Sequence, residues 1–169
     1  PEPGVSVLAG NDFIDAFFAD GGLFVVQADG VILLSRSGEV VQEYESPRTI
    51  ESAAFEGQWL GVADQAVLTT FDLALGIVAD TTLVEGCSSA VMVSGPRFVC
   101  GPENDWDRIL YTYDALSGEL LGTSAPYTYN GIPMRRVPGT DDFVTVTHDL
   151  SPSDFHLYSA AEDPIVFVN

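Results

Sequence analysis

The chain has 169 residues, 46% of them hydrophobic and 18% charged, so it can form one domain with a core and is not a disordered acidic tail. Its 25 Asp and Glu outweigh 6 bases, all of them arginine, and the formal net charge is −19. Such a surface repels phosphate backbones and anionic lipids, which argues against nucleic acids and membrane surfaces as partners. No apolar run approaches the roughly 20 residues that a membrane-spanning helix needs.

Apolar and polar residues alternate in short runs that are interrupted by Gly, Asp, Asn, Ser or Pro, and no stretch sustains an amphipathic helix. Strands are predicted near 13–18, 23–28, 30–36, 39–45, 50–55, 58–64, 66–72, 76–84, 89–94, 97–101, 108–115, 118–123, 132–137, 142–149, 154–160 and 164–169. Short strands at this density are typical of an all-β sandwich, barrel or propeller.

An internal repeat distinguishes among these three architectures. Four segments each read as a strand, a short polar turn and a second strand, and they begin at Val31, Val67, Ile109 and Phe155. Their turn glycines Gly38, Gly76 and Gly118 lie roughly 40 residues apart, and Asp163-Pro164 replaces the glycine in the fourth copy. Each segment follows a hairpin, so every repeat has four strands, which is the signature of a propeller blade. The predicted blades lie near residues 11–48, 49–86, 87–130 and 131–169.

The third copy, ILYTYDALSGELLGT, resembles the strand–turn–strand unit of β-propellers of the quinoprotein-dehydrogenase-like and YVTN kind. Asp114, which closes the third strand, and Gly118-Glu119, which opens the fourth, match that pattern. The resemblance implies an all-β propeller of about four four-stranded antiparallel blades. In quinoprotein enzymes the fourth strand usually carries a tryptophan that docks each blade on the next, and here Leu121 and Val41 take its place. We therefore expect no quinone cofactor.

Residues 4–9 predict one more apolar strand before the first repeat. The last repeat already supplies an outer strand at 164–169, so residues 4–9 match the outer strand of a blade that would precede this chain. Two interpretations stay open. The chain is either a self-contained four-bladed ring with one decorated blade or half of a larger ring that a second copy or another protein completes.

Cys87 and Cys100 are the two cysteines, 13 residues apart around a Gly95-Pro96 turn. They are either two buried thiols or a disulfide, which would indicate an oxidising compartment. The spacing is not CxxC and no histidine cluster accompanies it, so a zinc site is not expected. With the acidic, lysine-free composition, we expect a secreted or periplasmic protein.

One acidic stretch could bind a metal ion. Glu103, Asp105 and Asp107 alternate along the longest loop of the third repeat, and oxygen ligands at this spacing suit Ca²⁺. The other interpretation is an Asn/Asp turn in which Asp107 pairs with Arg108. We expect no other cofactor.

Two groups of residues could contact a ligand. Tyr127, Tyr129 and Asn130 fall in a predicted loop and, if exposed, would form a ligand-contacting rim. Arg135 and Arg136 are the only basic pair, and strand alternation sends them to opposite faces, one toward the central channel and the other toward a neighbouring blade. Arg135 could therefore bind a carboxylate in the channel, or both arginines could form internal ion pairs.

Catalytic groups are few. The only two histidines, His148 and His156, flank a predicted turn that carries Ser151 and Ser153, and Asp149 and Asp154 lie close by. A His–Asp pair could act as a general base for a serine, but a hairpin tip is flexible and wet and therefore poorly preorganised.

Two functions follow from these patterns. The sequence favours a non-catalytic binding or scaffolding module for a protein, peptide or glycan, because no nucleophile, base and oxyanion donor converge. The alternative is a propeller hydrolase or lactonase that holds a divalent metal in its channel, with Asp15, Glu51 and Arg135 as the inward-facing set.

Overall fold

The computed structural model describes residues 12–102, 109–124, 131–147, 154–161 and 166–167, which form 16 β-strands and their connecting turns. Each strand overlaps one of the predicted ranges. The described part of the chain contains no helix with the length and apolar character needed to span a membrane. The predicted strand at 4–9 lies outside the described residues.

The strands form four antiparallel four-stranded sheets, in which each strand pairs with the next along the chain. Blade 1 consists of β1 (Phe13–Ala19), β2 (Gly22–Gln27), β3 (Gly30–Ser35) and β4 (Val40–Glu45). Blade 2 consists of β5 (Ser52–Glu56), β6 (Trp59–Ala63), β7 (Val67–Phe71) and β8 (Ile77–Thr82). Blade 3 consists of β9 (Ser89–Val93), β10 (Arg97–Gly101), β11 (Tyr111–Asp114) and β12 (Leu120–Thr123). Blade 4 consists of β13 (Gly131–Arg136), β14 (Asp142–Thr147), β15 (Asp154–Ser159) and β16 (Val166–Phe167).

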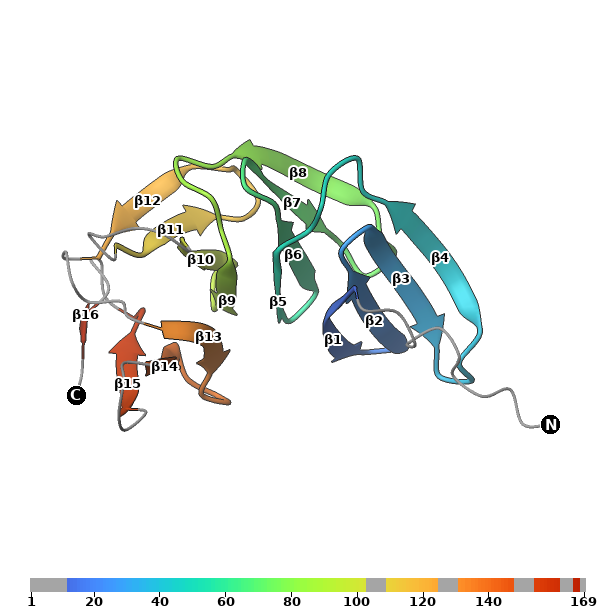
Figure 1. The fold of residues 1–169 in the computed structure, drawn as a ribbon. Coiled ribbons are helices and arrows are strands. Elements are labelled where there is room, and N and C mark those ends of the chain that lie inside the picture. Colours follow the sequence, from blue (N-terminus) through green and yellow to red (C-terminus); the bar gives the residue numbers. More distant parts are fainter. Residues whose placement is uncertain (1–11, 103–108, 125–130, 148–153, 162–165, 168–169) are drawn as a thin grey trace.

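The blades stand side by side along an arc, with β1, β5, β9 and β13 on its inner side and β4, β8 and β12 on its outer side (Figure 1). Blade 1 and blade 4 lie at the two ends, and the arc is open between them (Figure 1). The predicted fold class, an all-β protein with four propeller blades, is confirmed.

In blades 2 and 3, an aspartate accepts the hydrogen bonds that form the turn between the third and fourth strands. In blade 3, the Asp114 carboxylate accepts hydrogen bonds from the backbone N–H groups of Ser117 (2.7 Å) and Leu116 (2.9 Å). These hydrogen bonds, of which the one from Ser117 has the larger effect, lower the pKa of Asp114 below its ordinary value. Gly118 then takes a φ of 78°, which only glycine adopts without strain. The predicted turn signal of an aspartate followed by a glycine therefore has a direct physical basis.

Each pair of neighbouring blades encloses its own apolar core, because every blade is sandwiched face to face with the next. The core between blades 1 and 2 includes Phe24, Leu33, Leu60 and Phe71. The core between blades 2 and 3 includes Leu68, Met92, Phe98 and Tyr113. The core between blades 3 and 4 includes Val91, Val99, Phe143 and Tyr158. Packing between blades positions the four innermost strands around one central space.

Candidate functional site

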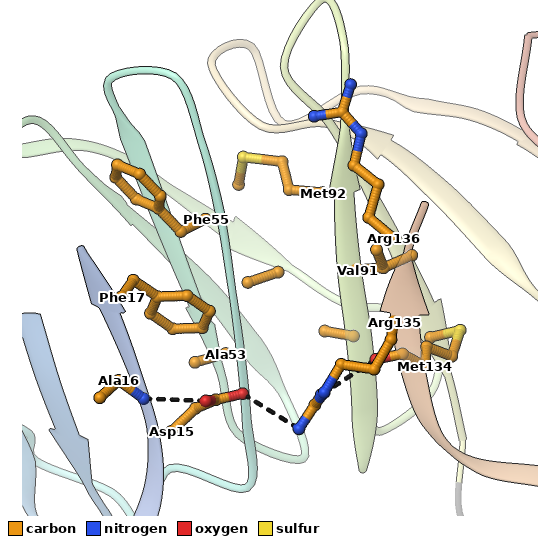
Figure 2. Close-up of a pocket in the computed structure, with 12 residues that line it drawn as sticks. Asp15, Ala16, Phe17, Ala53, Phe55, Val91, Met92, Met134, Arg135 and Arg136 are labelled. Carbon is orange, nitrogen blue, oxygen red and sulfur yellow. Dashed lines mark hydrogen bonds and ion pairs between the residues drawn. The ribbon is translucent and has the colours of Figure 1, made fainter. Parts of the chain in front are cut away.

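The central space is a cavity of about 280 Å³ lined by all four innermost strands (Figure 2). Most of the lining is apolar and much of it small, with Ala16, Phe17, Ala53, Ala54, Phe55, Ala90, Val91, Met92 and Met134. Its charged groups are Asp15 from β1 and the neighbouring Arg135 and Arg136 from β13. The two ends of the arc thus bring opposite charges to one channel.

Asp15 and Arg135 meet across the open side of the channel. Arg135 Nη2 lies 3.4 Å from Asp15 Oδ2, while Asp15 Oδ1 accepts the Ala16 backbone N–H at 2.8 Å (Figure 2). The Arg135 side chain is 60% exposed and also donates to the Met134 carbonyl at 3.0 Å. An ion pair this exposed contributes only about 0–1 kcal/mol. Either charge can therefore exchange its partner for a ligand at little cost.

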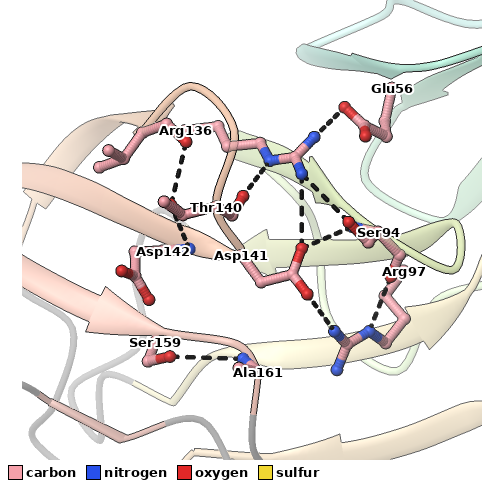
Figure 3. A network of polar contacts seen from close by, with 10 residues as sticks. Glu56, Ser94, Arg97, Arg136, Thr140, Asp141, Asp142, Ser159 and Ala161 are labelled. Atoms are coloured by element: carbon pink, nitrogen blue, oxygen red, sulfur yellow. Dashed lines mark hydrogen bonds and ion pairs between the residues drawn. The ribbon is translucent and has the colours of Figure 1, made fainter.

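Arg136 points the other way and is held in a polar network that joins blades 2, 3 and 4 (Figure 3). Its guanidinium pairs with Glu56 of blade 2, donates to Ser94 Oγ of blade 3 at 3.2 Å, and lies 3.4 Å from Asp141 Oδ1 of blade 4. It also donates to the Thr140 carbonyl at 2.6 Å. With these contacts the Arg136 guanidinium is fixed as a connection between blades.

Asp141 is the acceptor at the centre of this network. Besides Arg136, it accepts the Ser94 backbone N–H at 3.0 Å and the Arg97 guanidinium at 3.2 Å. Partial burial by itself would raise the pKa of the Asp141 carboxyl, but the Ser94 hydrogen bonds and the charges of Arg97 and Arg136 outweigh it, and the pKa is lowered. The network stabilises the joint between blades 3 and 4 and leaves Arg135 as the arginine at the channel mouth.

The predicted site residues fall into two groups. The separation of Arg135 and Arg136 to opposite faces is present in the structure, and Asp15 joins Arg135. Glu51, the third member of the predicted channel set, is not among the residues that line the cavity. His156 lies on β15 opposite Thr145. The other predicted residues, Glu103, Asp105, Asp107, Tyr127, Tyr129, Asn130, His148, Asp149, Ser151 and Ser153, lie outside the described residues, and the side chain of Asp154 does too.

Metal binding has no candidate group in the described part of the chain, where three or more His, Cys, Asp or Glu side chains nowhere come together to hold an ion. The calcium site at Glu103, Asp105 and Asp107 and the hydrolase with a metal bound in its channel therefore both stay predictions.

Sequence reasoning missed the network around Asp141. Asp141-Asp142 reads as a solvated hairpin tip, since adjacent acids commonly occupy such turns, yet Asp141 contacts two arginines from different blades. The sequence indicates only that acids outnumber arginines, so that arginines are expected to form ion pairs. It does not indicate that Asp141 is the acid that contacts Arg97 and Arg136.

Cys87 and Cys100 form a disulfide within blade 3, with their Cα atoms 5.4 Å apart. Both cysteines are buried in the core between blades 2 and 3. Ser52 of blade 2 donates its hydroxyl to the Cys87 carbonyl at 2.7 Å, so the bridged segment also fastens the neighbouring blade. The disulfide is compatible with an oxidising compartment.

Comparison with known proteins identifies the fold. No known protein family and no curated protein matches the sequence. Among solved structures, the RRP9 WD40 repeats match 92% of this chain and 50% of their own, with a TM-score of 0.71 and 12% identity. The Neurospora crassa Pan2 WD40 domain matches 92% of this chain and 48% of its own, with a TM-score of 0.64 and 12% identity.

The fold is a set of four β-propeller blades that matches about half of a WD40 β-propeller. The chain spans about half the length of these WD40 chains. It also matches the computationally designed Ika4 protein over 88% of this chain and 92% of that one, with a TM-score of 0.66 and 10% identity. The four blades thus match nearly the whole of that designed chain. The finer resemblance to quinoprotein-like and YVTN propellers stays a prediction.

Proposed function

We propose that the chain is a non-catalytic binding module that docks a basic segment of a partner protein at the mouth of its channel. The observation that carries the proposal is how the chain uses its few cations. Five of the six arginines lie in the described part, and four of them, Arg48, Arg97, Arg135 and Arg136, already pair with the chain's own acids. The surface that a partner meets is therefore dominated by carboxylates.

A net charge of −19 attracts a basic partner at long range and accelerates its association. At the channel mouth, the exposed Asp15–Arg135 pair provides the short-range contact. An incoming Lys or Arg replaces Arg135 on the Asp15 carboxylate, and the apolar channel floor accepts the aliphatic part of the same side chain. WD40-like propellers typically serve as protein-binding scaffolds, which supports this choice over catalysis. The released Arg135 keeps its bond to the Met134 carbonyl.

The disulfide within blade 3 supports a location outside the cytoplasm, in a secreted or periplasmic protein. Partners would then be sought among extracytoplasmic proteins with basic surface segments.

A peptide selection tests the proposal. A random peptide library is selected on the wild-type chain, and the binding of enriched peptides is measured by fluorescence anisotropy at low and at physiological salt. We expect enrichment of Lys and Arg and a several-fold loss of affinity in Asp15→Asn. Asp64→Asn is the matched control, because it removes the same charge from another ion pair, Arg48–Asp64 at 3.2 Å, away from the channel. Enrichment of neutral or acidic peptides, or equal losses in the two variants, would contradict the proposal.

A further inference from the structure

Each blade has two faces, and we call the one that is directed toward the preceding blade position in the arc the leading face. On this face, the same three positions, one on each of the first three strands, recur in all four blades. Cross-strand pairing identifies the set, because residues directly opposite one another share a face. The sets are Phe18–Leu23–Leu34 in blade 1, Phe55–Leu60–Phe71 in blade 2, Met92–Phe98–Tyr113 in blade 3 and Arg136–Phe143–Tyr158 in blade 4. Apart from Arg136, every member is apolar or aromatic.

In blades 2, 3 and 4 the leading face is covered by the preceding blade. Leu60 and Phe71 lie in the core shared with blade 1, Phe98 and Tyr113 in the core shared with blade 2, and Phe143 and Tyr158 in the core shared with blade 3. These six side chains are all essentially inaccessible to solvent. The repeated positions are therefore the surface through which one blade docks on another.

Blade 1 carries the same surface without a preceding blade in the described chain. Phe18 is 85% exposed, whereas Met92 at the equivalent position of blade 3 is 1% exposed. Leu23 is partly exposed, while Leu34 is already buried, so the open part of the face is centred on Phe18. A phenylalanine this exposed on a strand otherwise built for docking marks an uncovered blade joint.

Blade 4 offers the complementary surface on its far side, which we call the trailing face. Arg135, Val144 and Leu157 stand opposite one another on β13, β14 and β15, and alternation directs them away from Phe143 and Tyr158. Val144 and Leu157 are partly exposed. The equivalent trailing position of Val144 in blade 3 is Val99, which packs in the core with blade 4. In the described part of the chain, the leading face of blade 1 is thus open around Phe18, and the trailing face of blade 4 is partly open around Val144 and Leu157.

We propose that two copies of this chain close an eight-bladed ring, in which the leading face of each blade 1 packs on the trailing face of blade 4 of the other copy. Leading-to-trailing contact is how the three joints within the chain are made, and a two-fold axis repeats it twice so that neither copy keeps an open face. The arc is open between blades 1 and 4 (Figure 1), and the chain matches about half of WD40 chains but nearly all of the Ika4 chain. The second copy also supplies the missing wall of the channel.

Charge opposes this assembly, since each copy carries a net charge of −19. Salt screens such repulsion over distances beyond the Debye length, while the apolar contact around Phe18 does not depend on screening. The ring is therefore expected to form more completely as the salt concentration rises. A dimer held by ion pairs would show the opposite dependence.

Light scattering of the 169-residue chain tests the proposal at about 20 mM and about 500 mM NaCl. We expect a mass of twice 18.1 kDa at the higher salt. Phe18→Glu should weaken the dimer about a thousandfold, since it affects both joints and one hot-spot loss is worth roughly thirtyfold. Because Phe18 is exposed in the single copy, the unfolding midpoint of the monomeric Phe18→Glu variant should equal that of the monomeric wild type. Ile77→Glu, at a 52% exposed residue on the outer strand β8, is the matched control and should leave the dimer intact.

A second variant tests which faces meet. Val144→Asp on the trailing face should disrupt the dimer as Phe18→Glu does, with circular dichroism checking that it folds and Leu157→Gln replacing it if it does not. A dimer that resists Val144→Asp and Leu157→Gln would contradict the ring, because two leading faces would then be in contact. A mass of 18.1 kDa at every salt and protein concentration, or open-ended larger assemblies, would also overturn the proposal.

Discussion

Replacing Asp141 with asparagine should weaken the joint between blades 3 and 4 while leaving the shape of the side chain unchanged. The asparagine carbonyl can still accept the Ser94 N–H, which the carboxylate accepts at 3.0 Å. What is lost is the negative charge beside Arg136 at 3.4 Å and, because an NH2 group takes the place of Oδ2, the acceptor of the Arg97 guanidinium at 3.2 Å. All three side chains are largely buried, so water replaces the lost charge poorly.

The expected cost follows from the number and kind of contacts. A hydrogen bond to a charged group contributes about 1.5–3 kcal/mol, and two such bonds lose their charge, so with partial solvent screening the free energy of unfolding should fall by about 2–3 kcal/mol. For a chain of this length that corresponds to roughly 5–10 °C in Tm. Asp64→Asn removes one ion pair, whose arginine, Arg48, is 53% exposed. The asparagine oxygen can still accept the Ala66 and Val67 N–H groups that Asp64 Oδ1 accepts, so this variant should cost less, about 0–1 kcal/mol.

Urea unfolding followed by tryptophan fluorescence measures both variants at pH 7 and in acid. Because the folded structure lowers the pKa of Asp141, its stabilisation is present above the ordinary aspartate value and is lost as pH falls through the lowered one. The difference between wild type and Asp141→Asn should therefore shrink from roughly pH 4 downward. The reasoning fails if Asp141→Asn is no more destabilising than Asp64→Asn, or if the difference persists in strong acid.

Two further substitutions test the core between blades 2 and 3. Tyr113→Phe removes the hydroxyl that accepts the Val84 N–H at 3.0 Å. Because a partly buried donor then loses its partner, the free energy of unfolding in urea titrations should fall by about 1–3 kcal/mol. No change would mean that water replaces the hydroxyl as the acceptor. Gly61→Ala should lower the free energy of unfolding by about 1–3 kcal/mol, since its Cβ would lie 2.7 Å from the fully buried Phe98 ring. Gly86→Ala is the control and should be nearly neutral, because the nearest atom to its Cβ lies at 3.5 Å. Equal shifts of Tm in the two alanine variants would refute the packing argument.

The proposed function and the proposed ring place different demands on the same channel. A basic segment competes with Arg135 for Asp15 within one copy, whereas closure of the ring depends on the apolar surface around Phe18. The two are separable by experiment, because Asp15→Asn should leave the mass in solution unchanged and Phe18→Glu should leave the Asp15 carboxylate in place. Binding by the single copy and binding by the ring can then be compared directly.

The sequence by itself determined the blades. Strand alternation and turn chemistry act within a few residues, so Asp114 and Gly118 define a turn wherever the blade lies in space. Alternation also separated Arg135 from Arg136, since neighbouring residues on a strand point to opposite faces. The repeat spacing then gave the number of blades, because each four-stranded unit recurs after roughly 40 residues.

Only the tertiary structure decided which distant groups meet. Asp15 and Arg135 come from the first and the last blade, and Asp141 contacts Arg97 across the joint between blades 3 and 4; no local pattern encodes either contact. The exposure of Phe18 was equally hidden, because its position in the repeat is equivalent to that of Met92, and the two differ in whether the described part of the chain packs another blade against them. Local sequence spacing determines which side chains lie on each face of a blade. Whether those side chains are buried, and which residues they contact, depends on how the blades are arranged around the channel.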